Sequence, residues 1–277
     1  MSNPPSKLVA FIAELRRRRI FRVVIVYAGV AFIIVQGLCV SCIFLPGGTI
    51  DASSAAEPRP LQQEKPEYPD PQRFEEAIQA FEAQDKTAPP PEGAIVCIGS
   101  SSMRGWHGTI QMDLAPLTII PRGFGGSTIH DALYYAERIV IAYKPRAVVL
   151  YEGDNDIALG ISPEQVLETF FALAAKIHNA LSQTRIYVLS IKPSIARWNF
   201  WPQMQEANQL LKAACEENGL LTYIDVASPM LNEHKEPKEE IFVQDMLHMN
   251  EKGYILWKAT VRSVLLKSEL QHERPQP

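Results

Sequence analysis

A short apolar run that stops at a glycine and three serines constrains the fold of this chain most. Residues 94–98 are apolar and partly β-branched, and Gly99 and the serines at 100–102 follow at once. Runs of this length bounded by a turn signal are typical of buried strands, parallel ones above all. A nucleophile directly after such a strand lies at the carboxyl edge of the sheet, where open α/β folds bind ligands. A plain polar turn is the alternative, and the rest of the chain decides between them.

The following residues predict strands that alternate with helices. After the strand at 94–98 we expect strands at 117–120, 147–151, 186–191 and 221–226. We expect helices at 70–84, from a cap at Ser127 to about 140, at 163–182, at 201–218, and from a cap at Asn250 to about 266. Such alternation is typical of a parallel sheet covered by helices on both faces. The sequence therefore predicts one three-layer α/β/α domain at 70–270, followed by a tail at 271–277.

A long apolar run precedes this domain. Residues 23–45 contain Gln36 and Ser41 as their only clearly polar side chains, and a helix of that length spans a hydrocarbon core of about 30 Å. Four arginines at 16–19 precede the run and no comparable cluster follows it. The positive-inside rule then predicts a basic cytoplasmic segment at 1–22, a transmembrane anchor at 23–45 and a Pro-rich extracytoplasmic linker at 46–69. A cleaved signal and a lipoprotein site at Cys42 are the alternatives.

The charge balance and the cysteines limit the classes of partner and site. The formal net charge is −4, and it becomes roughly −9 when the basic segment 1–22 is set aside. An acidic domain argues against nucleic acid as a partner. Cys39, Cys42, Cys97 and Cys215 show no metal-ligand spacing with a histidine, so we expect all four to be unpaired. We expect no cofactor and no metal.

Four groups of polar residues occupy positions that a parallel sheet can bring together. They are residues 100–102, 123–127 and 153–156, each after a predicted strand, and 245–248, just before the last helix. Each group alone has an ordinary explanation, since Asn155 suits a turn and His248 suits the protein surface. Asp154 and Asp156 are conceivable metal ligands, but no histidine or further carboxylate is grouped with them.

In this order the groups resemble the motifs of the SGNH hydrolases, the GDSL-type esterase and lipase family. The family has four sequence motifs in a fixed order. Their counterparts here are Gly-Ser-Ser-Ser at 99–102, Arg-Gly-Phe-Gly-Gly-Ser at 122–127, Gly-Asp-Asn-Asp at 153–156 and Asp-Met-Leu-His at 245–248. The resemblance covers about 95–265. It implies the flavodoxin-like SGNH hydrolase fold with a central parallel sheet, and a serine esterase that works through an acyl-enzyme.

The resemblance also assigns roles to individual residues. It makes Ser101 the nucleophile, His248 the general base and Asp245 the carboxylate that orients this base. It also implies an oxyanion hole formed by the backbone N–H of Ser101, the backbone N–H of Gly126 and the side-chain amide of Asn155. The chain departs from the family pattern at Ser100 and Ser102, which occupy the places of the usual Asp and Leu.

The substrate is less constrained than the chemistry. Candidate substrate-binding residues are Arg104 and Trp106 after the nucleophile, and Lys192, Ser194, Arg197 and Trp198 after the fourth predicted strand. Tryptophan and arginine suit sugar stacking and anion pairing, which favours O-acetyl groups on carbohydrate. Short-chain lipid esters or thioesters are the second possibility. A tethered binding protein without activity and a phosphate-binding doubly wound domain are further alternatives. The second of these is disfavoured because no phosphate-loop glycine pattern follows the first predicted strand.

A second resemblance concerns location. Residues 11–23 resemble a membrane-entry segment found at the front of several bacterial membrane proteins. It implies a single-pass protein of a bacterial inner membrane with a periplasmic catalytic domain. The expected partners are therefore an ester substrate and the membrane, and the oligomeric state stays open.

Overall fold

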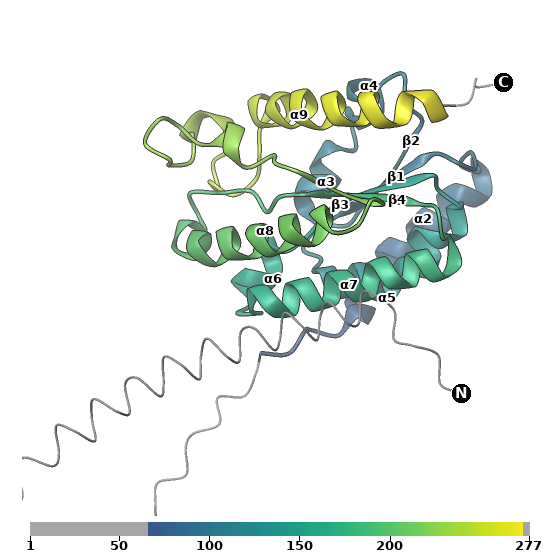
Figure 1. Ribbon diagram of the computed structural model, residues 1–277, viewed down its shortest axis with the longest axis horizontal. Helices are drawn as coiled ribbons and strands as arrows, with labels where there is room; N and C mark the ends of the chain where they lie inside the picture. Colours follow the sequence, from purple (N-terminus) through teal and green to yellow (C-terminus); the bar gives the residue numbers. More distant parts are fainter. Residues whose placement is uncertain (1–65, 274–277) are drawn as a thin grey trace, which may run out of the picture. The chain divides into compact units, whose positions relative to one another are not determined.

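The computed structural model of the chain describes residues 66–273 (Figure 1). The predicted cytoplasmic segment and anchor, Cys39 and Cys42, linker residues 46–65 and tail residues 274–277 lie outside this range. Among the helices within it, none combines the length and apolar character needed to cross a membrane.

Five parallel strands form one sheet in the order β2-β1-β3-β4-β5. They are β1 (Ile95–Gly99), β2 (Ile119–Gly123), β3 (Ala147–Tyr151), β4 (Arg185–Leu189) and β5 (Leu221–Ile224). Gly99, the last residue of β1, is paired with Gly123 on one side and Tyr151 on the other. The first three strands therefore end level with one another, and the loops after them open at one edge.

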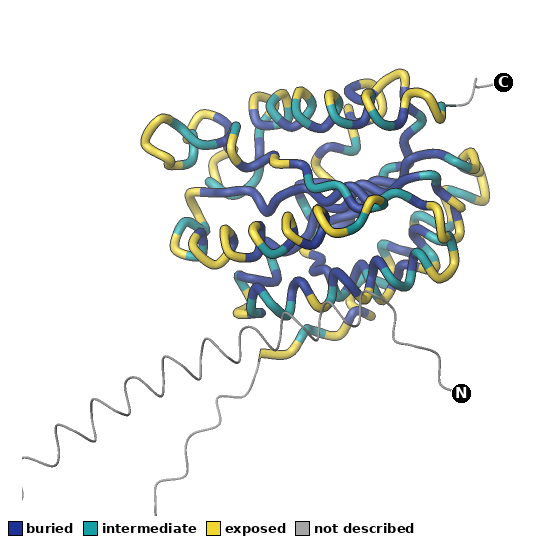
Figure 2. Tube along the Cα trace, viewed as in Figure 1, coloured by how far each residue is buried: buried dark blue, intermediate teal, exposed yellow. Residues whose placement is uncertain are grey.

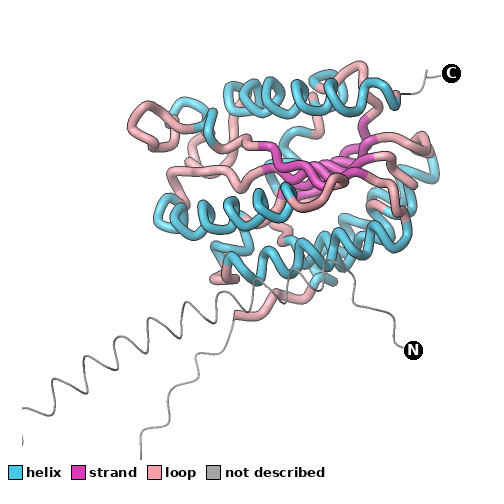
Figure 3. Tube along the Cα trace, viewed as in Figure 1, coloured by secondary structure: helices cyan, strands magenta, loops and turns pink. Residues whose placement is uncertain are grey.

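Helices cover both faces of the sheet, which confirms the predicted α/β/α arrangement (Figure 3). One layer contains α2 (Glu75–Thr87), α5 (Ile129–Ile139), α7 (Pro163–Ala180) and α8 (Trp201–Glu216). The other contains α3 (Ser101–Trp106), α4 (Ile110–Asp113) and α9 (Glu251–Glu269). A short helix, α6 (Asp154–Ala158), follows β3 directly.

The strands are buried almost throughout, as Figure 2 shows by their dark blue colour. Every residue of β1 and β3 is buried, which explains why both appear in the sequence as unbroken apolar runs rather than alternating ones. Trp257 of α9 lies in the core between Trp106 and Tyr151, with ring centroids 5.9 Å and 4.8 Å away. Cys97 and Cys215 are buried and free, as expected.

The fourth and fifth strands end two residues earlier than predicted, at Leu189 and Ile224, and two further local predictions were wrong. The second strand extends to Gly123 instead of ending at residue 120, because Pro121 is tolerated on β2, an edge strand that needs hydrogen bonds on one side only. The cap of α5 is Thr128, not Ser127. The Thr128 hydroxyl accepts the N–H of Asp131 in a capping box, while the Ser127 hydroxyl donates to buried Glu152 at 2.6 Å.

Candidate active site

Ser101 is the first residue of α3 and follows β1 after a one-residue turn. The turn depends on Gly99, whose φ is +150° and where a Cβ would overlap the carbonyl oxygen of Tyr151. Ser100 and Ser102 are each only 2% exposed, whereas Ser101 is half-buried. Of the three serines, Ser101 is therefore the one that solvent and a substrate can reach.

His248 and Asp245 form a pair within one loop. Nδ1 of His248 lies 2.6 Å from Oδ2 of Asp245, and both side chains are substantially exposed. The other carboxylate oxygen accepts the N–H groups of Leu247 and His248, each at 2.9 Å. The hydrogen bond from His248, followed by these two N–H groups, holds the pKa of Asp245 well below its usual range. Asp245 is therefore an anion at neutral pH.

The predicted glycine turn lies beside Ser101. A Cβ built on Gly125 would be 3.8 Å from Cβ of Ser101 and 3.4 Å from Nη1 of Arg104. Gly126 is exposed and has a φ of +87°, which a residue with a side chain rarely adopts. This conformation sets the direction of the Gly126 N–H group.

Asn155 lies in the first turn of α6, after the end of β3. Its Nδ2 donates one hydrogen bond to the carbonyl oxygen of Ser127 at 2.7 Å, and its Oδ1 accepts one from Nη1 of Arg197 at 3.0 Å. The carboxamide is therefore held at both ends, while the second N–H of Nδ2 stays available to another acceptor.

The loop with His248 reaches this edge of the sheet through the segment after β4. Lys192 Nζ donates to the carbonyl oxygen of Leu247 at 2.8 Å. The N–H of Ala196 donates to the carbonyl oxygen of Met246 at 3.1 Å. No hydrogen bond of the described residues joins the Ser101 hydroxyl to His248. Catalytic hydrogen bonds are often long in free enzymes and tighten when substrate binds.

The predicted substrate-binding residues fall into two groups. Arg104 is exposed beside Gly125, Arg197 is partly exposed next to Asn155, and Trp198 is partly exposed and stacked on Trp201. Trp106, Lys192 and Ser194 are buried, at 0%, 1% and 2% exposure, so their contact with a substrate stays a prediction. The indole Nε1 of Trp106 donates to Asp113 instead, which makes this residue part of the core between α3 and α9.

The acidic residues of the third motif serve the protein's own hydrogen bonds. Asp154 is paired with Arg197 and lies 3.6 Å from Nζ of Lys192, and Asp156 accepts the N–H groups of Ile129 and Gly153. Within residues 66–273 no group of three or more His, Cys, Asp or Glu side chains is placed to hold a metal ion. Sequence reasoning missed this ion-pair network, because its members come from separate loops.

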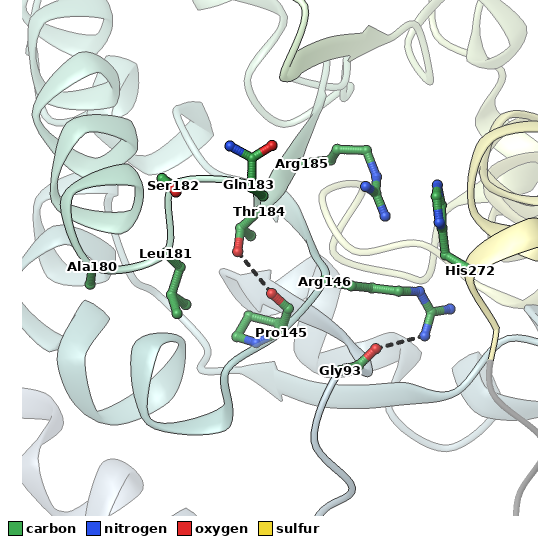
Figure 4. A pocket seen from close by; sticks show the side chains of 10 residues that line it. All are labelled: Gly93, Pro145, Arg146, Ala180, Leu181, Ser182, Gln183, Thr184, Arg185 and His272. Atoms are coloured by element: carbon green, nitrogen blue, oxygen red, sulfur yellow. Dashed lines mark hydrogen bonds between the residues drawn. The ribbon is translucent and has the colours of Figure 1, made fainter.

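A hollow of about 650 Å³ lies at the opposite, amino-terminal edge of the sheet (Figure 4). It is lined by residues that precede β1, β3 and β4 and by His272 near the end of the described chain. Its two arginines are neutralised by two carboxylates, since both pair with buried Glu269 and Arg146 also pairs with Glu273. This hollow contains none of the predicted site residues, and its charged groups link the end of α9 to the sheet.

Comparisons with known proteins agree with this fold and this set of motifs. The family model described as "GDSL-like Lipase/Acylhydrolase family" matches residues 92–256. No curated protein sequence is significantly similar to the chain. The chain belongs to the GDSL-like lipase and acylhydrolase family, and it is an ester hydrolase of that kind.

Solved structures share the fold at low sequence identity. A GDSL-like lipase from Bacteroides thetaiotaomicron superposes with a TM-score of 0.58 at 20% identity, over 69% of this chain and 98% of that one. A lipase/acylhydrolase from Enterococcus faecalis gives a TM-score of 0.50 at 19% identity, over 66% and 99%. An acetylxylan esterase from Geobacillus stearothermophilus gives 0.51 at 14% identity, over 62% and 93%.

Proposed function

We propose that this ester hydrolase is a serine esterase whose nucleophile is Ser101, with His248 as general base and Asp245 as the residue that orients His248. The observation that carries the proposal is the partial exposure of Ser101 between two buried serines, at the edge of the sheet that Asn155 and the His248 loop also reach. Asp245 fixes Nδ1 of His248 as the donor, which leaves Nε2 free to accept a proton.

The reaction then follows in two halves. Ser101 Oγ attacks the carbonyl carbon of the ester while His248 Nε2 takes the hydroxyl proton. The tetrahedral intermediate collapses, His248 returns the proton to the departing alcohol, and an acyl-Ser101 ester remains. A water molecule then loses a proton to His248 and attacks this ester, which releases the acid and restores Ser101.

The developing negative charge of each intermediate needs donors that are already in place. The backbone N–H groups of Ser101 and Gly126 and the second N–H of Asn155 Nδ2 fit this role. Gly126 supports it by its left-handed backbone, and Asn155 by a carboxamide that hydrogen bonds hold at both ends.

The substrate class we propose is a short acyl ester, such as an O-acetyl group on carbohydrate. The supporting side chains are Arg104 beside Gly125 and Trp198 beside Arg197, since both types bind sugars and their acidic groups well. A distant structural neighbour is described as an acetylxylan esterase.

A short-chain lipid ester or thioester is the second candidate, and one observation favours it. Ile195 and Val243 are 37% and 41% exposed, and the segments that carry them are joined by the hydrogen bond from Ala196 to Met246. Apolar side chains at this position suit an acyl chain or a lipid surface.

For the location we propose a single-pass anchor at 23–45 in a bacterial inner membrane, with the catalytic domain periplasmic, on the basis of the charge asymmetry around the apolar run.

The test is esterase activity of the full chain in detergent, with p-nitrophenyl acetate and butyrate as substrates. Ser101→Ala should lower kcat by several orders of magnitude and abolish labelling by a fluorophosphonate probe. Ser102→Ala is the matched control, because its hydroxyl is buried one residue away, and it should keep labelling and most activity. A wild-type protein that neither turns over esters nor reacts with the probe would support a tethered binding protein instead.

A further inference from the structure

Lys192 is a buried lysine whose ammonium group reaches the backbone beside His248. The residue is 1% exposed, and its Nζ donates to the carbonyl oxygen of Leu247 at 2.8 Å. Hydrogen bonds from a charged donor are stronger than neutral ones. This bond therefore fixes the peptide that leads directly into His248.

Arg197 makes the equivalent contact with the proposed oxyanion hole. Its guanidinium pairs with the carboxylate of Asp154 and also donates to Oδ1 of Asn155 at 3.0 Å. The same carboxylate lies 3.6 Å from Lys192 Nζ and accepts a 3.3 Å hydrogen bond from the hydroxyl of Tyr151. Asp154, which is 5% exposed, is thus shared by the lysine and the arginine.

Both basic residues project from a segment that is itself held firmly. Its first part is fixed by Asn208 of α8, whose side chain accepts the N–H of Ile191 at 2.7 Å and donates to the Ile191 carbonyl at 2.9 Å. The N–H of Ala196 then bonds to Met246. Residues 190–197 therefore connect a rigid helix, the His248 loop and the Asn155 carboxamide.

The energetics indicate that these charges do not serve stability alone. A buried ammonium group loses its hydration, and an ion pair in the interior recovers that cost only with good geometry. The network at the other edge, Arg146 and Arg185 around Glu269, joins α9 to the starts of strands. The donors of the network around Asp154 instead contact the Leu247 carbonyl, next to His248, and the carboxamide of Asn155.

From this geometry we infer that Lys192 and Arg197, through their shared partner Asp154, are positioning residues that hold the His248 loop and the Asn155 amide in register. The inference rests on the proposed function, because it assigns these two elements to one active site. Neither residue touches the reacting atoms. Their effect is on the placement of His248 Nε2 and of the Asn155 N–H relative to the ester.

The surroundings of Lys192 fit a group that works as a hydrogen-bond donor in a confined site. Asp154 and Asp245 are the acidic groups near its ammonium group, Tyr151 faces its backbone, and the ring of Phe242 lies 5.9 Å from Nζ. Burial lowers the pKa of Lys192 to about 7, against the opposing effect of Asp245.

The test compares Lys192→Met, Arg197→Met and the double variant in the full chain. We expect each single change to lower kcat for p-nitrophenyl acetate about 10- to 100-fold, because small misplacements of catalytic groups have effects of that size. KM should change less than about threefold, and the rate of fluorophosphonate labelling of Ser101 should fall with kcat. The fold-loss of kcat in the double variant should be smaller than the product of the two single fold-losses, because both residues act through Asp154.

Arg185→Met is the matched control for the loss of a buried ion pair. It breaks the pair with Glu269 at the far edge of the sheet, so it should lower the melting temperature and leave kcat and the labelling rate unchanged. If Lys192→Met does not fold, Arg197→Met carries the test, because the Arg197 side chain is 21% exposed and lies in a loop segment.

The outcomes separate the inference from the proposed function. Folded Lys192→Met and Arg197→Met variants with the wild-type kcat and labelling rate would overturn the inference while Ser101→Ala still abolished activity. Losses confined to KM, or equal kcat losses in Arg185→Met, would also overturn it. A wild-type chain that is inert towards both ester and probe would overturn the proposed function, and the inference with it.

Discussion

Nδ1 of His248 lies 2.6 Å from one oxygen of Asp245, while the other oxygen of that carboxylate accepts two backbone N–H groups of the same loop. One side chain therefore orients the imidazole and shapes the loop that carries it. Because these contacts lower the pKa of Asp245 far below neutrality, the carboxylate is ionised wherever His248 is needed as a neutral base.

Replacing this carboxylate by an amide should separate its two roles. In Asp245→Asn the amide oxygen can still accept the two N–H groups, but the amide nitrogen cannot support Nδ1–H of His248. We expect kcat for p-nitrophenyl acetate to fall about 10³- to 10⁴-fold, because the wrong imidazole tautomer is favoured. The circular dichroism spectrum and melting temperature should stay close to the wild-type values.

The chain offers a close structural control for this change. Asp225 also accepts two N–H groups, from Ala227 and Ser228, two and three residues ahead. Asp225→Asn should keep kcat within roughly twofold of wild type, since Asp225 is exposed and its hydrogen bonds stay within its own turn. Similar losses in both variants would mean that Asp245 acts only on loop structure.

Gly126 provides a test of the oxyanion hole. With φ at +87° and open space around a Cβ, Gly126→Ala meets no steric clash but favours a negative φ by about 1 kcal/mol. The N–H group then turns away from the nucleophile. We expect kcat to fall about 10- to 100-fold with little change in KM. This is a smaller loss of kcat than complete removal of an oxyanion-hole donor causes.

Gly160→Ala isolates the backbone effect. Gly160 has a φ of +84°, and a Cβ there would make an ordinary 3.7 Å contact with Pro66. Its substitution should lower the free energy of unfolding by about as much as Gly126→Ala and leave kcat unchanged. If both variants lose the same stability but only Gly126→Ala loses kcat, the loss is due to the direction of the Gly126 N–H. If both variants keep the same kcat, Gly126 has no part in the mechanism.

The sequence was sufficient to predict the order and type of the main elements, because these depend on local patterns. The strand at 147–151 and the helix start at Pro163 have the predicted limits, since a buried apolar run and a capping Ser-Pro pair mark them. The short helix α6 was missed. Gly-Asp-Asn-Asp is typical of a turn, and only the packing at the end of β3 extends it into a helix.

The features of the site that the sequence missed have a common cause, namely that burial is decided by distant segments. Trp106 follows the proposed nucleophile closely in sequence, but α9 covers it. Ser127 is a good capping residue by type, but Glu152 takes its hydroxyl and leaves the cap to Thr128. The contact between Lys192 and Leu247 joins residues 55 positions apart, which no periodicity in a single sequence indicates.

Asp156 makes stability depend on pH. It is fully buried, and its carboxylate accepts the N–H of Ile129 at 3.1 Å and that of Gly153 at 3.1 Å. Burial raises its pKa from the ordinary 3.8 to about 7. Between about pH 4 and pH 7 the folded protein therefore retains a proton that the unfolded chain releases. The stability that this group contributes is complete at low pH and is lost as the pH rises to about 7.

Asp156→Asn should remove this dependence, because the amide resembles the protonated acid and its oxygen still accepts both N–H groups. In urea unfolding the variant and the wild type should have similar free energies of unfolding near pH 4. By pH 8 the variant should be the more stable by a few kcal/mol, since a pKa shift of one unit corresponds to about 1.4 kcal/mol. Parallel stability curves for the two proteins would show that Asp156 stays charged in the fold, stabilised by its N–H donors despite its burial.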